Sequence, residues 1–111
     1  MKYYQYTNTS YKKAIEYSNC IFKKFIVKYN PKKILDCGCG SGAYISSALS
    51  FTSANIEGVD LDLHKELKRF KKNKRVSLFE EDILVYSKNT KENYDVILAL
   101  NIIEHLSLKD A

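Results

Sequence analysis

The sequence has few of the features that mark secreted or membrane proteins. Its cysteines number only 3, and a single residue separates Cys37 from Cys39, so a disulfide framework is not expected. No apolar run approaches the ~20 residues of a transmembrane helix, and residues 1–5 contain no hydrophobic signal core. We therefore expect a cytoplasmic protein with no membrane span, in which these thiols are small filler side chains.

Glycine is also scarce, with 4 residues, yet three of them alternate in one short segment, Asp36-Cys37-Gly38-Cys39-Gly40-Ser41-Gly42. The apolar pair Ile34-Leu35 directly before it is typical of a buried strand that enters a loop. Such glycines can simply shape a tight turn, but their alternation also lets a ligand lie against bare backbone. The segment therefore predicts a loop that binds a nucleotide cofactor.

The composition is that of an ordinary globular protein, with 45% hydrophobic and 28% charged residues in a chain of 111, which fits one domain. The net charge of +5 is concentrated between Lys65 and Arg75, a segment that could contact RNA phosphates. Because no aromatic platform accompanies these charges, the solvated face of a surface helix is the simpler explanation.

Hydrophobic periodicity divides the chain into alternating helices and strands, and the only proline, Pro31, follows the first helix. Helices are predicted at residues 10–29, 43–50 and 61–72, and strands at residues 33–36, 55–60, 75–79 and 94–100. This alternation indicates the α/β class, with a Rossmann-like parallel sheet and helices on both faces. Residues 96–100 lack polar alternation, which suits a strand buried on both faces.

Acidic residues follow the second and third predicted strands. Asp60 comes about 20 residues after Gly38, where a carboxylate can accept hydrogen bonds from both ribose hydroxyls. Asp82 is suited to an adenine amino group, and Ile83 to the adenine ring. Either aspartate could instead cap the helix that follows it.

Two kinds of cofactor fit the loop. The spacing of Gly38, Gly40 and Ala43 satisfies the dinucleotide fingerprint, so an NAD-binding oxidoreductase fragment is one alternative. Asp36, however, lies shortly before Gly38, where its charge would repel a pyrophosphate. A ligand with an ammonium group and a sulfonium centre would be attracted there instead.

With these motifs in order, residues 33–106 resemble the class I S-adenosylmethionine-dependent methyltransferases. The resemblance also includes the fourth-strand signature of small-molecule members, from Tyr94-Asp95-Val96-Ile97 to Glu104-His105-Leu106. It implies S-adenosylmethionine as the cofactor. The cofactor-binding residues that it implies are Asp36, Gly38, Gly40, Gly42, Asp60, Leu61, Asp82, Ile83 and Asn101.

The resemblance leaves the catalytic groups less defined. His105 is a candidate general base, but a Glu-His pair can equally stabilise a strand-to-helix turn. Relatives that methylate the terminal ribose of small RNAs have an acidic metal ligand where this chain has Asn101, so we expect no metal site. The methyl acceptor is expected to be a small molecule whose identity the motifs do not define.

Members of this family have further strands after the fourth. We therefore expect one methyltransferase-like domain, with a helical segment at residues 1–31 and cofactor-binding βα units at residues 32–111, truncated after about four strands. The fourth strand would be an exposed edge for self-association or a partner chain, and the isolated chain would have little catalytic activity. A non-catalytic interaction module with the same fold is a further alternative.

Overall fold

The computed structural model describes residues 8–99, which form a parallel sheet of 4 strands in the order β3-β2-β1-β4. The strands are β1 (Lys33–Cys37), β2 (Asn55–Asp60), β3 (Val76–Glu80) and β4 (Val96–Leu98). The helices are α1 (Asn8–Tyr29), α2 (Ala43–Phe51), α3 (Ile83–Asn89) and the short 3₁₀ helix η1 (Lys65–Phe70). The predicted α/β class and parallel sheet are confirmed.

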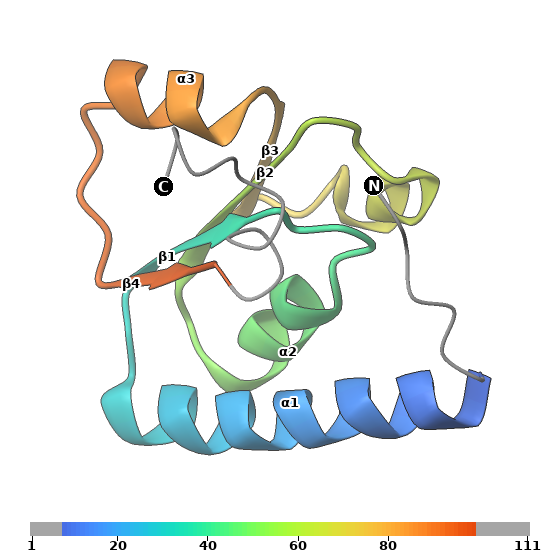
Figure 1. The fold of residues 1–111 in the computed structure, drawn as a ribbon. Coiled ribbons are helices and arrows are strands. Elements are labelled where there is room, and N and C mark those ends of the chain that lie inside the picture. Colours follow the sequence, from blue (N-terminus) through green and yellow to red (C-terminus); the bar gives the residue numbers. More distant parts are fainter. Residues whose placement is uncertain (1–7, 100–111) are drawn as a thin grey trace.

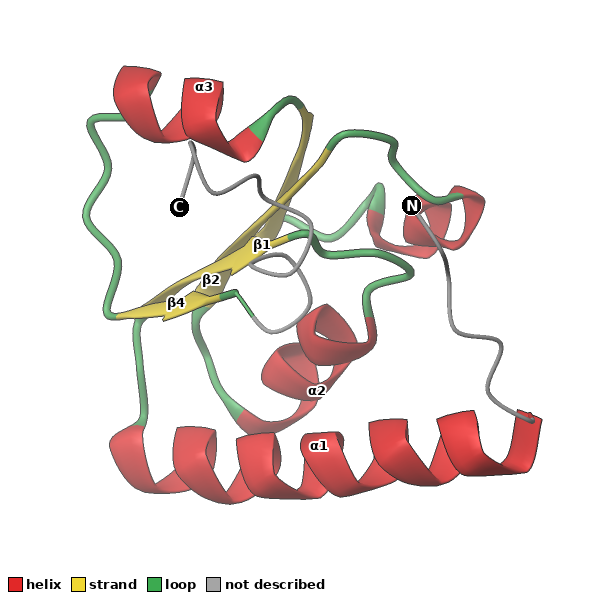
Figure 2. Cartoon of the chain, viewed as in Figure 1, coloured by secondary structure: helices red, strands yellow, loops and turns green. Residues whose placement is uncertain are grey.

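The helices lie on both faces of the sheet, with α1 and α2 on one side and α3 on the other (Figures 1 and 2). From β1 the chain proceeds outward through β2 and β3 and then crosses back to β4 on the opposite side of β1. The direction of the crossovers therefore changes at the carboxyl end of β1, which is where open α/β sheets bind ligands.

The core is split by the sheet into two clusters. On the side of α1 and α2, the fully buried side chains of Ile26, Ile34, Ile45 and Ile56 interlock. On the side of α3, the smaller cluster consists of Leu35, Cys37, Val59 and Tyr86. Neighbouring residues of β1, such as Ile34 and Leu35, thus point to opposite faces and are buried on both, as is typical of a central parallel strand.

The predicted helix at residues 61–72 is wrong in length and type. The structure has only η1, because the carboxylate of Glu80 accepts a hydrogen bond from the Leu63 backbone nitrogen at 3.1 Å and His64 caps the helix. In a 3₁₀ helix, residues three apart share a side. Leu67 and Phe70, three residues apart, therefore lie on the same side of η1 and are both buried.

The prediction of a fourth strand buried on both faces is also wrong. β4 is shorter than residues 94–100, and within it Val96 and Leu98 are buried whereas Ile97 is 60% exposed. β4 pairs with β1 at one end of the described sheet. The described helix on the face of Ile97 is α3, and it packs against β2 rather than against β4. The run of apolar residues therefore predicted a strand correctly but did not predict which of its side chains are buried.

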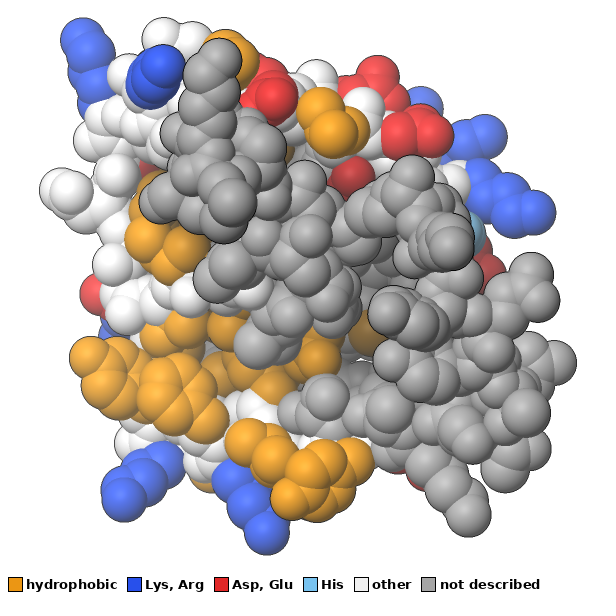
Figure 3. Space-filling view, in the orientation of Figure 1, with side chains coloured by type: hydrophobic (Ala, Val, Ile, Leu, Met, Phe, Trp, Pro, Cys, Tyr) orange, Lys and Arg blue, Asp and Glu red, His pale blue; other side chains and the backbone are white. Residues whose placement is uncertain are grey.

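Part of the surface is apolar, and Figure 3 shows hydrophobic side chains gathered over the C-terminal part of α1. Phe25 and Tyr29 stack there with ring centroids 5.4 Å apart. No helix among the described residues is both long and apolar enough to cross a membrane.

Candidate functional site

The glycine loop joins β1 to α2 and is anchored to the end of β2. The backbone nitrogens of Gly38 and Cys39 both donate to the Val59 carbonyl, at 2.7 and 3.2 Å. The Gly42 carbonyl then accepts from the nitrogen of Ser46 at 2.9 Å, in the first turn of α2. These bonds fix the loop at the carboxyl edge of the sheet before any ligand is present.

Two of the loop glycines serve different purposes. Gly42 has a φ of 89°, and a Cβ there would lie 2.7 Å from Phe70 and 2.9 Å from Leu67 of η1. The packing against η1 therefore leaves no room for a side chain at position 42. Gly40 has a φ of 53°, but a Cβ there would meet no atom within 4 Å. Gly40 therefore leaves open space beside bare backbone, which is the condition for close approach of a ligand.

Asp36 is a buried carboxylate at the end of β1, with 3% of its surface exposed. Its Oδ2 has no hydrogen-bond partner within the described part of the chain. Burial, with a smaller contribution from the nearby Asp60, raises the pKa of Asp36 to about 7. An unpaired buried carboxylate is costly to a protein on its own, and a cationic hydrogen-bond donor would satisfy it.

Asp60 links the end of β2 to the glycine loop. Its Oδ2 accepts a hydrogen bond from the Gly40 nitrogen at 2.9 Å, and its Oδ1 faces the Asp62 nitrogen at 3.4 Å. It does not cap the next helix, because His64 has that role in η1. The carboxylate is partly exposed and keeps acceptor capacity for hydroxyl groups.

The residues expected around adenine lie at the same edge of the sheet. The Glu81 nitrogen donates to the Asp60 carbonyl at 2.9 Å, which brings the exits of β2 and β3 together. Leu61 is 72% exposed, whereas Ile83 is partly buried against the α3-side cluster. Asp82 caps α3, since its Oδ1 accepts from the Leu84 nitrogen at 2.8 Å. The capping role, which the sequence left open, is thus what the structure shows for Asp82.

The remaining predicted site residues, Asn101 and His105, lie outside the described residues, as do Glu104 and Leu106 of the fourth-strand signature. Within residues 8–99, no group of three or more His, Cys, Asp or Glu side chains could hold a metal ion. Cys37 and Cys39 are buried, and burial raises their thiol pKa values to about 11 and about 12. At neutral pH both thiols are therefore protonated and poor nucleophiles.

Two arginines of the basic segment support the structure around the site, which the sequence did not reveal. Arg69 donates to the Ser41 carbonyl of the glycine loop at 2.8 Å, and its guanidinium lies 4.2 Å from the centre of the Phe70 ring. Arg75 donates to three backbone carbonyls at the end of α2 and just beyond it. A charge count cannot distinguish such structural arginines from solvated lysines.

A polar cluster on the α3 side of the sheet was also not predicted from the sequence. The hydroxyls of Tyr86 and Tyr94 both donate to Glu57 Oε2, and Lys33 Nζ lies 3.6 Å from Glu57 Oε1. Burial and the neighbouring Glu57 raise the pKa values of both tyrosines. The cluster satisfies a carboxylate in the middle of β2, away from the carboxyl ends of the strands, so we assign it to stability.

Comparison with known proteins gives the family. A family model described as a methyltransferase domain matches residues 11–110. An uncharacterized protein of Methanocaldococcus jannaschii is 34% identical over 83 residues, which cover 72% of this chain and 34% of that protein. The chain therefore spans about a third of this curated relative.

Solved structures show the same fold. A SAM-dependent methyltransferase from Archaeoglobus fulgidus superposes with a TM-score of 0.63 at 21% identity, covering 86% of this chain and 42% of that one. An O-methyltransferase family protein from Burkholderia thailandensis gives a TM-score of 0.62 at 18% identity, covering 76% of this chain and 27% of that one. The aligned part of this chain covers less than half of either protein.

Proposed function

Because the chain belongs to the methyltransferase-domain family, we propose that it binds S-adenosylmethionine at the carboxyl ends of β1 and β2 and contributes this site to methyl transfer. The observation that carries the proposal is Asp36, a buried carboxylate with an unpaired oxygen, in the strand that leads into the loop where the Gly40 backbone is open. A cofactor with an ammonium group and a sulfonium centre would compensate this charge.

The described residues fit such a cofactor by their chemistry. Asp36 would hold the ammonium group, and the loop glycines Gly38, Gly40 and Gly42 would shape the backbone around the methionine part. Asp60 would accept hydrogen bonds from the ribose, as its free acceptor capacity permits. We propose Leu61, Asp82 and Ile83 for the adenine end. Asn101, outside the described residues, stays a proposed cofactor-binding residue.

The bound cofactor supplies a methyl group on a sulfonium, which is an activated leaving group. The residues of this chain would then act mainly by binding, orienting and excluding water. We keep His105 as a candidate base for acceptors that carry a proton. A small-molecule acceptor agrees with the resemblance of residues 94–106 to small-molecule members of the family.

Isothermal titration of the purified chain with S-adenosylmethionine tests the proposal. We expect the wild-type chain to bind S-adenosylmethionine and Asp60→Ala to bind it roughly 10-fold or more weakly. The substitution removes the carboxylate that accepts hydrogen bonds from the Gly40 nitrogen and, in the proposed complex, from the ribose hydroxyls. Asp62→Ala is the matched control, since the Asp62 side chain is exposed, carries the same charge and takes part in none of the hydrogen bonds observed among the described residues. Circular dichroism would verify that both variants keep the native fold.

Two results would contradict this assignment. Selective binding of NAD would favour the oxidoreductase alternative, and binding of neither cofactor would favour a non-catalytic interaction module. Activity is a separate question, because the chain spans 42% or less of the solved structures compared above. We propose that the isolated chain has weak or no turnover, and robust methylation by residues 1–111 alone would refute that part.

A further inference from the structure

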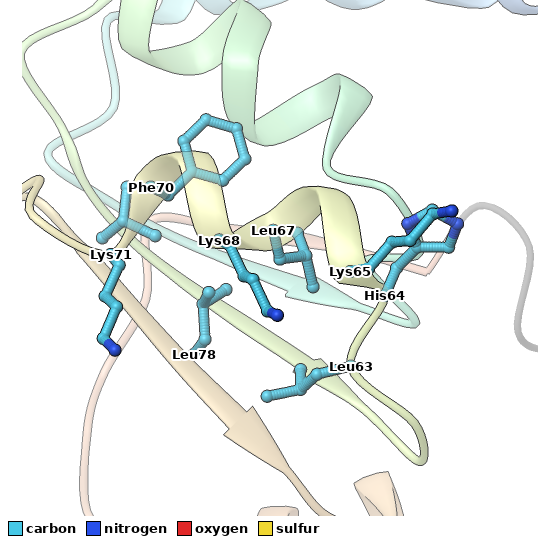
Figure 4. Close-up of a pocket in the computed structure, with 9 residues that line it drawn as sticks. Leu63, His64, Lys65, Leu67, Lys68, Phe70, Lys71 and Leu78 are labelled. Carbon is cyan, nitrogen blue, oxygen red and sulfur yellow. The ribbon is translucent and has the colours of Figure 1, made fainter.

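A concave site lies beside η1, and none of the glycine-loop residues lines it. It is a hollow of about 400 Å³ between η1, the segment before it and β3. Its floor is apolar and consists of Leu63, Leu67, Phe70, Val76 and Leu78. Its volume is within the usual range of small-molecule sites, and Figure 4 shows the side chains around it.

The rim of this hollow is cationic. Lys65, Lys68 and Lys71 follow one another at intervals of three residues, and in a 3₁₀ helix such residues align along one edge. Figure 4 shows Lys68 reaching from η1 toward the space between Leu63 and Leu78. None of the residues that line the hollow is acidic.

These lysines differ from the arginines of the same segment. Arg69 and Arg75 are held by backbone carbonyls, as described above. Lys65, Lys68 and Lys71 are exposed, and within residues 8–99 their side-chain ammonium groups take part in none of the observed hydrogen bonds or ion pairs. Their positive charge is therefore available to a ligand, directly above apolar surface.

We propose that the hollow between η1 and β3 binds an amphipathic carboxylate, with an aliphatic chain on the apolar floor and the anionic head at Lys68, where Lys65 and Lys71 on either side add positive charge. The apolar chain would remove the exposed floor from water, and the lysines would hold the head by charge complementarity. S-adenosylmethionine does not suit this hollow, because its cationic groups would face the lysines. RNA does not suit it either, since a polyanion would leave the apolar floor unused.

Octanoate is the probe for this site, followed by ¹⁵N–¹H NMR of the full chain at concentrations where octanoate is monomeric. We expect shifts confined to the amides around Leu63, Leu67, Val76 and Leu78. Octanol, which lacks the charge, and acetate, which lacks the chain, should bind more weakly. Hexanoate should also bind more weakly, by up to roughly fourfold for each buried methylene removed.

Matched variants separate this site from nonspecific binding. Lys68→Gln should weaken octanoate binding roughly two- to fivefold, the effect of one exposed charge pair. Lys24→Gln is the control, because Lys24 is an exposed lysine of α1 that does not line the hollow. Leu63→Ala tests the floor with a half-buried residue and should also weaken binding.

The proposal does not depend on the proposed methyl transfer and can fail separately. Equal affinities for octanoate and octanol would overturn it, as would equal effects of Lys68→Gln and Lys24→Gln. A short RNA can be tested as a competitor of octanoate. If the RNA displaces octanoate and loses more affinity than octanoate does in Lys68→Gln, the lysines bind nucleic acid instead.

Discussion

At the scale of single residues, Asp36 makes the stability of the chain depend on pH. Folding raises the pKa of Asp36 from 3.8 to about 7, so the folded state binds this proton more tightly than the unfolded state. Its contribution to stability is complete below about pH 4 and is lost as the pH rises through about 7, at up to ~1.4 kcal/mol per pH unit. Asp36→Asn should remove this slope.

Urea unfolding at several pH values between 4 and 8 measures the effect of Asp36. Asp62→Asn, which changes an exposed acid, should keep the slope of the wild-type chain. Asp36→Asn should also weaken S-adenosylmethionine binding roughly 10-fold or more, because the anionic acceptor is gone. An unchanged pH dependence in Asp36→Asn would mean that another group binds the proton.

Gly42 and Gly40 form a matched pair for testing the loop. Gly42→Ala would force a left-handed alanine and place its Cβ 2.7 Å from Phe70, so we expect a loss of ~2–5 kcal/mol of unfolding free energy. Gly40→Ala meets open space and should lose only the conformational part, ~1–2 kcal/mol. Chemical denaturation compares the two, and similar losses would contradict the packing role of Gly42.

At the scale of elements, α2 depends on a cation from elsewhere in the chain. It has no basic residue in its last turn, and Arg75 donates instead to the carbonyls of Leu49, Thr52 and Ala54 at 3.3, 2.6 and 2.9 Å. Arg75→Gln should therefore lower the unfolding free energy by ~1.5–3 kcal/mol. Lys74→Gln, which changes an exposed neighbour, should stay within ~0.5 kcal/mol.

Thermal and urea unfolding of these variants test whether Arg75 stabilises the end of α2. Arg75→Lys should recover only part of the loss, because an ammonium cannot reproduce the planar fork that reaches three carbonyls. If Arg75→Gln and Lys74→Gln lower the unfolding free energy equally, the hydrogen bonds of Arg75 do not stabilise α2.

The elements that the sequence predicted well are those with local signals. β1, α2 and β2 could be placed because the apolar runs and the glycine loop define their ends. η1 could not, since the backbone contact of Leu63 with Glu80 joins residues far apart in sequence. The exposure of Ile97 depends on which helix covers which strand, and periodicity carries no such information.

The candidate site shows the same division between local and long-range information. The sequence indicated Asp36, Gly40 and Asp60 as neighbours, since the carboxyl ends of parallel strands meet at one edge. It could not show that Asp60 accepts from the Gly40 nitrogen or that Arg69 holds the loop from η1. Such contacts arise only when crossovers bring separate segments together.

At the scale of the whole molecule, the strand order predicts a gradient of local stability. β1 and β2 each have two neighbours in the sheet, whereas β3 and β4 each have one in the described part of the chain. Amide hydrogen exchange should therefore be slowest in β1 and β2 and faster in β4. Mass spectrometry of peptides covering each strand measures this gradient.

The dependence of exchange on protein concentration then tests β4 as a contact edge, which we propose because Ile97 is 60% exposed beside the edge of the sheet. If two chains associate through β4, its amides should become protected as the concentration rises, while those of β3 should not. Ile97→Lys should abolish this protection, because a charge on that face disfavours pairing. Val85→Lys is the control, since Val85 is 46% exposed on α3. Protection of β4 that is independent of concentration would instead mean that its edge is covered within one chain.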